Sequence, residues 1–143
     1  MSANVLRPQD LHKITEDKEM AKVRESLAHK KKEDEEQQHL REAFMAGDVR
    51  PNVMDLLNAA VRRAAEQNLS ELMVMSFPSA WCTDRGRTIN NASPDWPESL
   101  QGRARKGYEF YEQNLKPLGY RLRAQVLNYP DGMPGDVGIY LAW

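Results

Sequence analysis

The stretch from Ser76 to Asn91 holds the residues of this chain whose types could do chemistry. It follows an apolar run and contains Cys82, which is the only cysteine, together with Arg85 and Arg87. A thiol close to guanidinium groups can have a lowered pKa and act as a nucleophile. Arginine also binds carboxylates and phosphates through paired hydrogen bonds. The stretch therefore offers two kinds of site, a reactive thiol and an anion site.

The thiol site lacks the partners that such chemistry needs. A nucleophilic cysteine is activated by a neighbouring base, but the three histidines, His12, His29 and His39, all precede residue 50. The chain has no second cysteine and no His-x-x-x-His pair, so the usual zinc sites are disfavoured. We expect no metal and no cofactor, and we expect Cys82 to pack beside Trp81. Enzymatic activity stays uncertain, with a non-enzymatic protein favoured.

The anion site would consist of Arg85, Arg87 and Thr88. These residues follow a predicted strand and precede a predicted helix, which is a common place for ligands in proteins of mixed helix and strand. The glycine patterns of nucleotide-binding loops are absent. A second interpretation is a plain turn in which Asp84 pairs with an arginine. A module that binds an anion, a nucleotide or nucleic acid is therefore our alternative function.

The composition limits the partners that the whole chain can attract. Its 143 residues include 41% hydrophobic and 29% charged residues, which fits one globular domain with an appendage. The 20 basic and 21 acidic residues nearly cancel, so nucleic acid is supported only weakly as a partner. A single cysteine fits a reducing compartment, and no apolar stretch predicts a signal peptide or a membrane span. We expect a cytoplasmic protein that does not bind membranes.

Residues 1–50 form a predicted charged helical arm. From Pro8 to Ala46 there is no glycine and no further proline, and helix-forming residues dominate. Five apolar residues near its start could bind a partner, namely Leu11, Ile14, Met20, Val23 and Leu27. The segment 30–39 that follows holds none, so a regular coiled coil is not established. Two interpretations stay open, a solvated spacer helix and an arm that docks on a partner or on a second copy.

Residues 51–143 form a predicted compact α+β domain. Apolar residues at helical spacing predict a helix over 53–67, which Asn68 ends in a left-handed cap. The run 72–77 is apolar at nearly every position, which is typical of a strand buried on both faces. A second helix begins at Trp96 and continues to about Leu115. It contains Gly102 and Gly107, whose cost to the helix we expect close backbone approach by a neighbour to compensate.

Two further strands complete the domain. Residues 120–126 and 137–143 both alternate in polarity, and the turn residues between them predict an antiparallel hairpin. The first strand, the helix and the next strand favour a parallel crossover. We therefore predict a small mixed three-stranded sheet in the order strand-helix-strand-strand, with two amphipathic helices on one face. The other face carries Arg121 and Arg123, and Trp143 is expected to be buried or at an interface.

These patterns favour a non-enzymatic interaction or regulatory protein of the cytoplasm. It would bind a protein partner, or self-associate, through the helical arm and the open sheet face. The residues predicted to make these contacts are Leu11, Ile14, Met20, Val23, Leu27, Arg121, Arg123 and Trp143.

Overall fold

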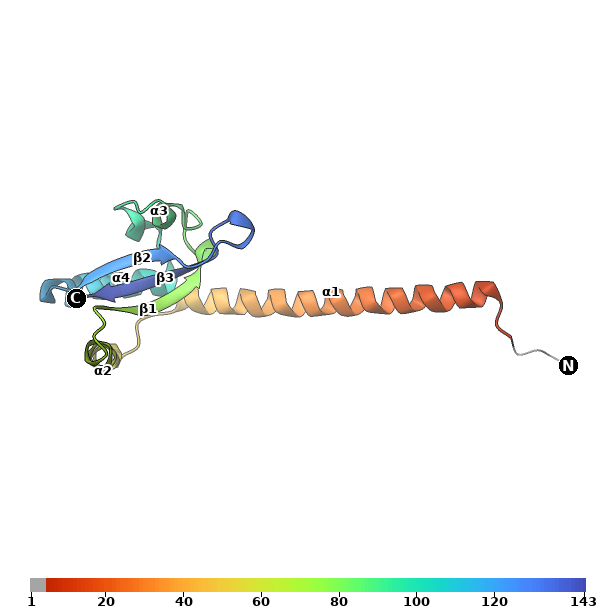
Figure 1. The fold of residues 1–143 in the computed structure, drawn as a ribbon, viewed down its shortest axis with the longest axis horizontal. Coiled ribbons are helices and arrows are strands. Elements are labelled where there is room, and N and C mark those ends of the chain that lie inside the picture. Colours follow the sequence, from red (N-terminus) through yellow and green to blue (C-terminus); the bar gives the residue numbers. More distant parts are fainter. Residues whose placement is uncertain (1–4) are drawn as a thin grey trace. The chain divides into compact units, whose positions relative to one another are not determined.

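The computed structural model describes residues 5–143 and shows an α+β protein, as the sequence predicts (Figure 1). The helices are α1 (Pro8–Ala46), α2 (Val53–Glu66), the short α3 (Arg87–Asn90) and α4 (Gly102–Asn114). The strands are β1 (Glu71–Pro78), β2 (Arg121–Val126) and β3 (Asp136–Ala142). The predicted helix over 53–67 is confirmed, and Asn68 takes the predicted left-handed conformation at its end, with φ of 63°.

The chain divides into two units, and we describe each by itself. One ends at Leu40, and the other, the compact unit, runs from Arg41 to Trp143. This boundary differs from the predicted one near residue 50 because Phe44, in the last turn of α1, is buried in the core of the compact unit. Its ring lies 5.1 Å from that of Phe77 and 4.8 Å from that of Trp81, measured between centroids.

The three strands form one sheet in the order β1-β3-β2, and both neighbouring pairs are antiparallel. The first two strands run in the same direction, as the crossover predicts, but β3 lies between them. The sheet is therefore antiparallel rather than mixed. Because β3 is the central strand, it holds the most buried side chains, among them Val137 and Leu141.

β1 is an edge strand, so the prediction that it is buried on both faces is wrong for its middle part. Met73 and Val74 remain 47% and 38% exposed. The register of β1 against β3 is irregular between Met73 and Met75, which leaves Val74 without a partner in the ladder. An edge position exposes side chains that a central strand would bury.

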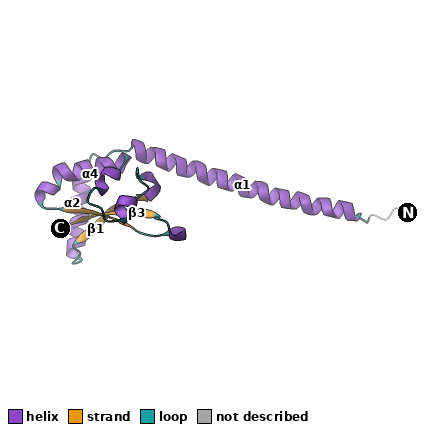
Figure 2. Cartoon of the chain, turned by 90° about the horizontal axis from the view of Figure 1, so that it is seen from above, coloured by secondary structure: helices purple, strands orange, loops and turns teal. Residues whose placement is uncertain are grey.

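One face of the sheet carries the core. Val137, Ile139 and Leu141 lie on this face, and α4 packs against it (Figures 1 and 2). Leu57 and Val61 of α2 pack against the Leu141 end of the same core. The prediction of two helices on one face is therefore confirmed, and the opposite face, here called the outer face, is left without a helix in the compact unit.

The predicted helix from Trp96 to Leu115 is broken in the structure. A 3₁₀ turn spans Trp96–Ser99, the chain becomes extended, and α4 begins at Gly102 with φ of +57°. A Cβ atom on Gly102 would lie 2.5 Å from the carbonyl oxygen of Phe44 and 2.6 Å from the Cα of Met45. The predicted close approach is thus confirmed for Gly102. At Gly107 the nearest atom would be the Cε of Met75 at 3.6 Å, an ordinary contact.

Candidate functional site

The loop from Ser76 to Asn91 is held by hydrogen bonds to distant segments. Ser79 donates from its backbone N–H to the carbonyl oxygen of Gly135 and from its hydroxyl to that of Pro134, both over 2.8 Å. The side-chain amide of Gln101 donates to the carbonyl oxygen of Trp81 over 3.2 Å. These bonds tie the loop to the β2–β3 connection and to the start of α4, so the backbone of the loop has a fixed place in the compact unit.

Cys82 in this loop is a core residue. It is 3% exposed and belongs to the same apolar cluster as Trp81, which confirms the predicted packing. Burial raises the pKa of its thiol to about 11, and the hydrogen bond with Ser99 offsets this only in part. The thiol is therefore protonated at neutral pH, and nucleophilic chemistry through its thiolate is disfavoured.

Asp84 organises the anion-site candidate in a way that the sequence did not predict. Its carboxylate accepts hydrogen bonds from the backbone N–H groups of Gly86, over 3.0 Å, and Thr88, over 2.9 Å. Burial raises the pKa of Asp84, but these hydrogen bonds outweigh it and hold the pKa below its usual value. The carboxylate thus takes the backbone donors at the start of α3, and Asp84 forms no ion pair with an arginine within residues 5–143.

Arg85 and Arg87 are both exposed at this loop and make no ion pair in the described part of the chain. The hydroxyl oxygen of Thr88 is buried. The structure therefore brings the two guanidinium groups to one surface loop, and it keeps the Thr88 hydroxyl away from any ligand at that surface. The anion site stays a prediction that rests on the two arginines.

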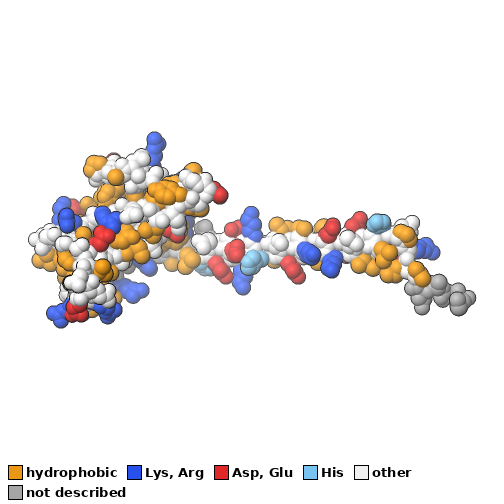
Figure 3. All heavy atoms as spheres, in the orientation of Figure 1, with side chains coloured by type: hydrophobic (Ala, Val, Ile, Leu, Met, Phe, Trp, Pro, Cys, Tyr) orange, Lys and Arg blue, Asp and Glu red, His pale blue; other side chains and the backbone are white. Residues whose placement is uncertain are grey.

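The outer face of the sheet combines apolar and charged groups. Met73, Leu127 and Tyr140 lie over Gly138, where a Cβ atom would come within 3.0–3.1 Å of all three side chains. We call Met73, Leu127, Gly138 and Tyr140 the Gly138 patch. Figure 3 views the outer face and shows hydrophobic atoms beside charged ones on the compact unit.

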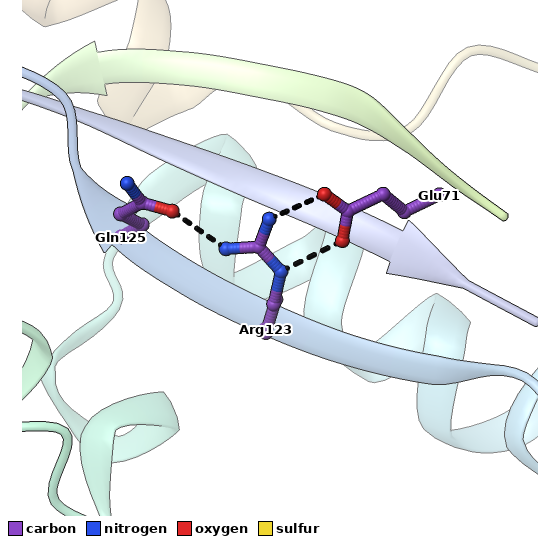
Figure 4. Close-up of polar contacts among 3 residues, drawn as sticks. All are labelled: Glu71, Arg123 and Gln125. Carbon is purple, nitrogen blue, oxygen red and sulfur yellow. Dashed lines mark hydrogen bonds and ion pairs between the residues drawn. The ribbon is translucent and has the colours of Figure 1, made fainter. Parts of the chain in front are cut away.

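Beside this patch Arg123 connects all three strands (Figure 4). From β2 its guanidinium reaches across β3 to Glu71 of β1, with Nη2 2.6 Å from Oε1 and Nε 2.9 Å from Oε2. The third nitrogen, Nη1, donates to the side-chain oxygen of Gln125 over 2.7 Å. The guanidinium carbon also lies 4.1 Å from the centroid of the Tyr140 ring, which is cation–π geometry.

The paired geometry perturbs both charges of this ion pair. The hydrogen bond from Arg123 lowers the pKa of Glu71, and the same bond raises that of Arg123. Both side chains remain 42% exposed, so solvent screens their attraction. Arg123 is thus ion-paired on the outer face. Arg121, which is predicted to contact a partner together with it, is exposed on that face without an ion pair in the described residues.

The remaining predicted contact residues fall into two places. Trp143 is half-buried and packs edge-on against Tyr120, with the ring centroids 6.5 Å apart, while its backbone N–H donates to Ser70 over 3.0 Å. The five apolar residues of α1 belong to the other unit and are all exposed, from 50% at Leu11 and Val23 to 61% at Leu27. The structure therefore joins Arg121 and Arg123 on one face of the compact unit, and the α1 residues are exposed on the other unit.

These α1 residues do not form a single stripe. At about 100° per residue, Leu11 and Ile14 lie on the side of the helix opposite Met20, Val23 and Leu27. Each side therefore offers two or three apolar side chains to a different contact.

Sequence reasoning missed Glu71 and the Gly138 patch. Glu71 precedes an apolar run and lies 52 residues before Arg123, so nothing local pairs the two side chains. Knowledge that β3 separates β1 from β2 would have placed them on one face. Gly138 was the one local signal, because a glycine within a strand suggests close approach by neighbouring groups.

Within residues 5–143 no cluster of three or more histidine, cysteine or acidic side chains could hold a metal ion, and no helix there is long and apolar enough to cross a membrane. Comparison with known proteins finds no family, no curated protein and no solved structure that matches the chain. The functional inference therefore rests on the residues and their geometry.

Proposed function

We propose that this chain is a non-enzymatic interaction protein of the cytoplasm that binds a protein partner, or a second copy of itself, through α1 and the outer face of the sheet. The observation that carries the proposal is the exposure of Leu11, Ile14, Met20, Val23 and Leu27, which are all at least half exposed. The proposed compartment rests on the single cysteine of the sequence.

The energetic argument starts from the helix itself. A helix in water gains most of its stability from packing an apolar face, and α1 has 39 residues of which Phe44 is the only buried one. Covering a leucine or valine side chain contributes about 1.5–3 kcal/mol. A partner that covers Met20, Val23 and Leu27 would therefore add several kcal/mol before the entropy of ordering is subtracted.

The two opposite apolar sides of α1 favour a partner that contacts more than one side. A second helix laid along one side would cover Met20, Val23 and Leu27 and leave Leu11 and Ile14 in water. A bundle or a groove could cover both sets. The outer face of the sheet would supply a separate contact through Arg121 and the Gly138 patch, where aromatic and methionine side chains suit protein contacts.

Sedimentation velocity can test self-association. The full chain is compared with a chain that starts at Arg41, which keeps Phe44 in its core, and with the full-length triple substitution Met20→Gln, Val23→Gln and Leu27→Gln. Lys30→Gln, Lys31→Gln and Lys32→Gln form the matched control, because these side chains lie in the apolar-free segment. If α1 self-associates, the full chain and the control are oligomers, and the other two chains are monomers.

If all four chains are monomers at high concentration, the second-copy version is excluded. The full chain is then used as bait in an extract of its own cells, with the triple glutamine chain beside it. A protein retained by the full chain and the lysine control, but released by the glutamine chain, supports a partner. Equal recovery on all baits refutes the role of α1.

The alternative function, anion binding at Arg85 and Arg87, is favoured by one observation. Both guanidinium groups are exposed and unpaired within the described residues. Replacing both by alanine should abolish binding of an anionic ligand that weakens steeply with added salt. Absence of any thermal shift of the wild type in a broad screen of anions would remove this alternative.

A further inference from the structure

The compact unit contains a groove of about 610 Å³ between α2, β1 and α4. Its walls are mainly apolar and include Leu56 and Ala60 of α2, Leu72 and Met75 of β1, and Phe110 of α4. The volume falls within the range of roughly 300–1,000 Å³ that small-molecule sites occupy. All residues that line the groove belong to the compact unit.

Side chains of the protein do not fill this groove. Gly107 lines it from α4, and the nearest atom to a Cβ added there would be the Cε of Met75, at 3.6 Å. Leu56 and Val74, which also line it, remain 45% and 38% exposed. Protein interiors are close-packed, and exposed apolar walls favour an apolar occupant by about 25 cal/mol per Å² covered.

One end of the groove is cationic. Arg103, near the start of α4, and Arg50, in the connection between α1 and α2, both line it. The guanidinium of Arg103 lies against Gly47, where a Cβ atom would be 2.8 Å from Nε. Neither arginine forms an ion pair with another of the described residues. Asp48 is the single acid at this end, so the two arginines leave a net positive charge.

The groove runs from this charged end along one face of α4. Arg103, Gly107, Tyr111 and Leu115 line it at intervals of four residues, which places them on one side of a helix. At about 1.5 Å per residue, the distance from Arg103 to Leu115 along the axis is roughly 18 Å. Tyr111 offers little polarity there, because its hydroxyl donates to the carbonyl oxygen of Tyr120 over 2.9 Å.

We propose that this groove binds an amphipathic monocarboxylate, such as a medium-chain or long-chain fatty acid. The carboxylate would accept hydrogen bonds from Arg103 and Arg50, since arginine matches a carboxylate with two parallel donors. The apolar chain would lie over Gly107, along the apolar walls of the groove. The groove has one charged end and one apolar end, which matches a ligand with a single head group. This site is independent of the proposed α1 contacts.

Isothermal titration of the full chain with dodecanoate, kept below its critical micelle concentration, tests the proposal. We expect one saturable site, weaker binding of dodecanol, and no binding of the dodecyltrimethylammonium cation. Arg103→Gln should weaken dodecanoate binding by roughly tenfold or more, because a charge-assisted hydrogen bond is lost. Lys106→Gln is the matched control, since Lys106 is exposed on α4 outside the groove and should leave binding unchanged.

Gly107→Phe provides a second variant, which would fill the groove while both arginines are kept. A circular dichroism spectrum and melting curve like those of the wild type show that it folds, and dodecanoate binding should then be lost. The proposal is overturned if the wild type shows no saturable binding, if dodecyltrimethylammonium binds as well as dodecanoate, or if Arg103→Gln and Lys106→Gln behave alike. It is also overturned if dodecanoate fails to bind and Gly107→Phe instead dissociates an oligomer, because the groove is then a protein interface.

Discussion

Alanine at Gly102 and alanine at Gly107 should change stability in opposite directions, although both glycines lie in α4. At Gly102 the backbone has φ of +57°, a left-handed conformation that costs an L-residue about 1–2 kcal/mol. The added Cβ would also overlap the backbone of Phe44 and Met45 at 2.5 and 2.6 Å. Overpacking of this kind costs roughly 1–3 kcal/mol.

The sum for Gly102→Ala is a loss of about 2–5 kcal/mol in the free energy of unfolding. The entire free energy of unfolding of a small protein is only about 5–15 kcal/mol. At about 4–8 °C per kcal/mol for a unit of this size, the melting temperature should fall by roughly 8–40 °C. At Gly107 the new methyl group meets only Met75, so Gly107→Ala should stabilise α4 by about 0.5–1 kcal/mol through helix propensity.

Urea unfolding followed by circular dichroism measures both changes, with the m-value checked for each variant so that midpoints can be compared. The contrast between the two variants separates the local geometry at Gly102 from any general response of α4 to alanine. Two similar shifts would refute the close approach between α4 and the last turn of α1. A Gly102→Ala protein within about 0.5 kcal/mol of the wild type, the range of an ordinary surface substitution, would refute it as well.

Three further predictions follow from side chains of the compact unit. Phe44→Ala should lower the free energy of unfolding by about 3–5 kcal/mol because Phe44 is buried against Phe77 and Trp81. In the same urea experiment the control Leu40→Ala, at an exposed position, should change this free energy by at most about 0.5 kcal/mol. Equal losses in the two variants would contradict the placement of Phe44. Cys82 should react with a thiol reagent slowly in the folded protein at neutral pH and rapidly in urea, because burial raises its pKa to about 11; equal rates, measured by absorbance, would show an accessible thiolate. Folding lowers the pKa of Glu71, so the stabilising effect of its carboxylate should be fully present above its unfolded pKa, about 4.3, and should be lost as pH falls through the lower folded value. The urea midpoints of Glu71→Gln and the wild type should therefore converge in acid. A difference that stays constant with pH would argue against the ion pair.

The elements that the sequence predicts well are those with local signals. The helix from Val53 ends at Glu66, shortly before the left-handed Asn68, and neighbouring residues reveal both its apolar period and this cap. The alternation in β3 likewise predicts the buried face formed by Val137, Ile139 and Leu141. Cys82 could be assigned to the core because no histidine follows His39, so its interpretation as a packed residue did not depend on the fold.

The features that escaped prediction depend on contacts between distant segments. The break before Gly102 is set by the backbone of Phe44 and Met45, which no helical pattern in residues 96–115 reveals. The Glu71–Arg123 pair requires the strand order, since Arg123 crosses the central strand to reach its partner. The groove is a gap between elements, and apolar periodicity gives the same signal whether a helix face is packed or only lines a space.

The irregular register of β1 also bears on how the protein behaves at high concentration. An edge strand with a regular row of free N–H and C=O groups can recruit the edge of another molecule and start a growing sheet. In β1 the ladder with β3 is interrupted between Met73 and Met75, and such a bulge bends and twists the strand. Met73 and Val74 are therefore exposed on an edge whose bend disfavours pairing with a strand of another molecule. Restoring a straight ladder there would turn the same apolar side chains into a seed for fibres.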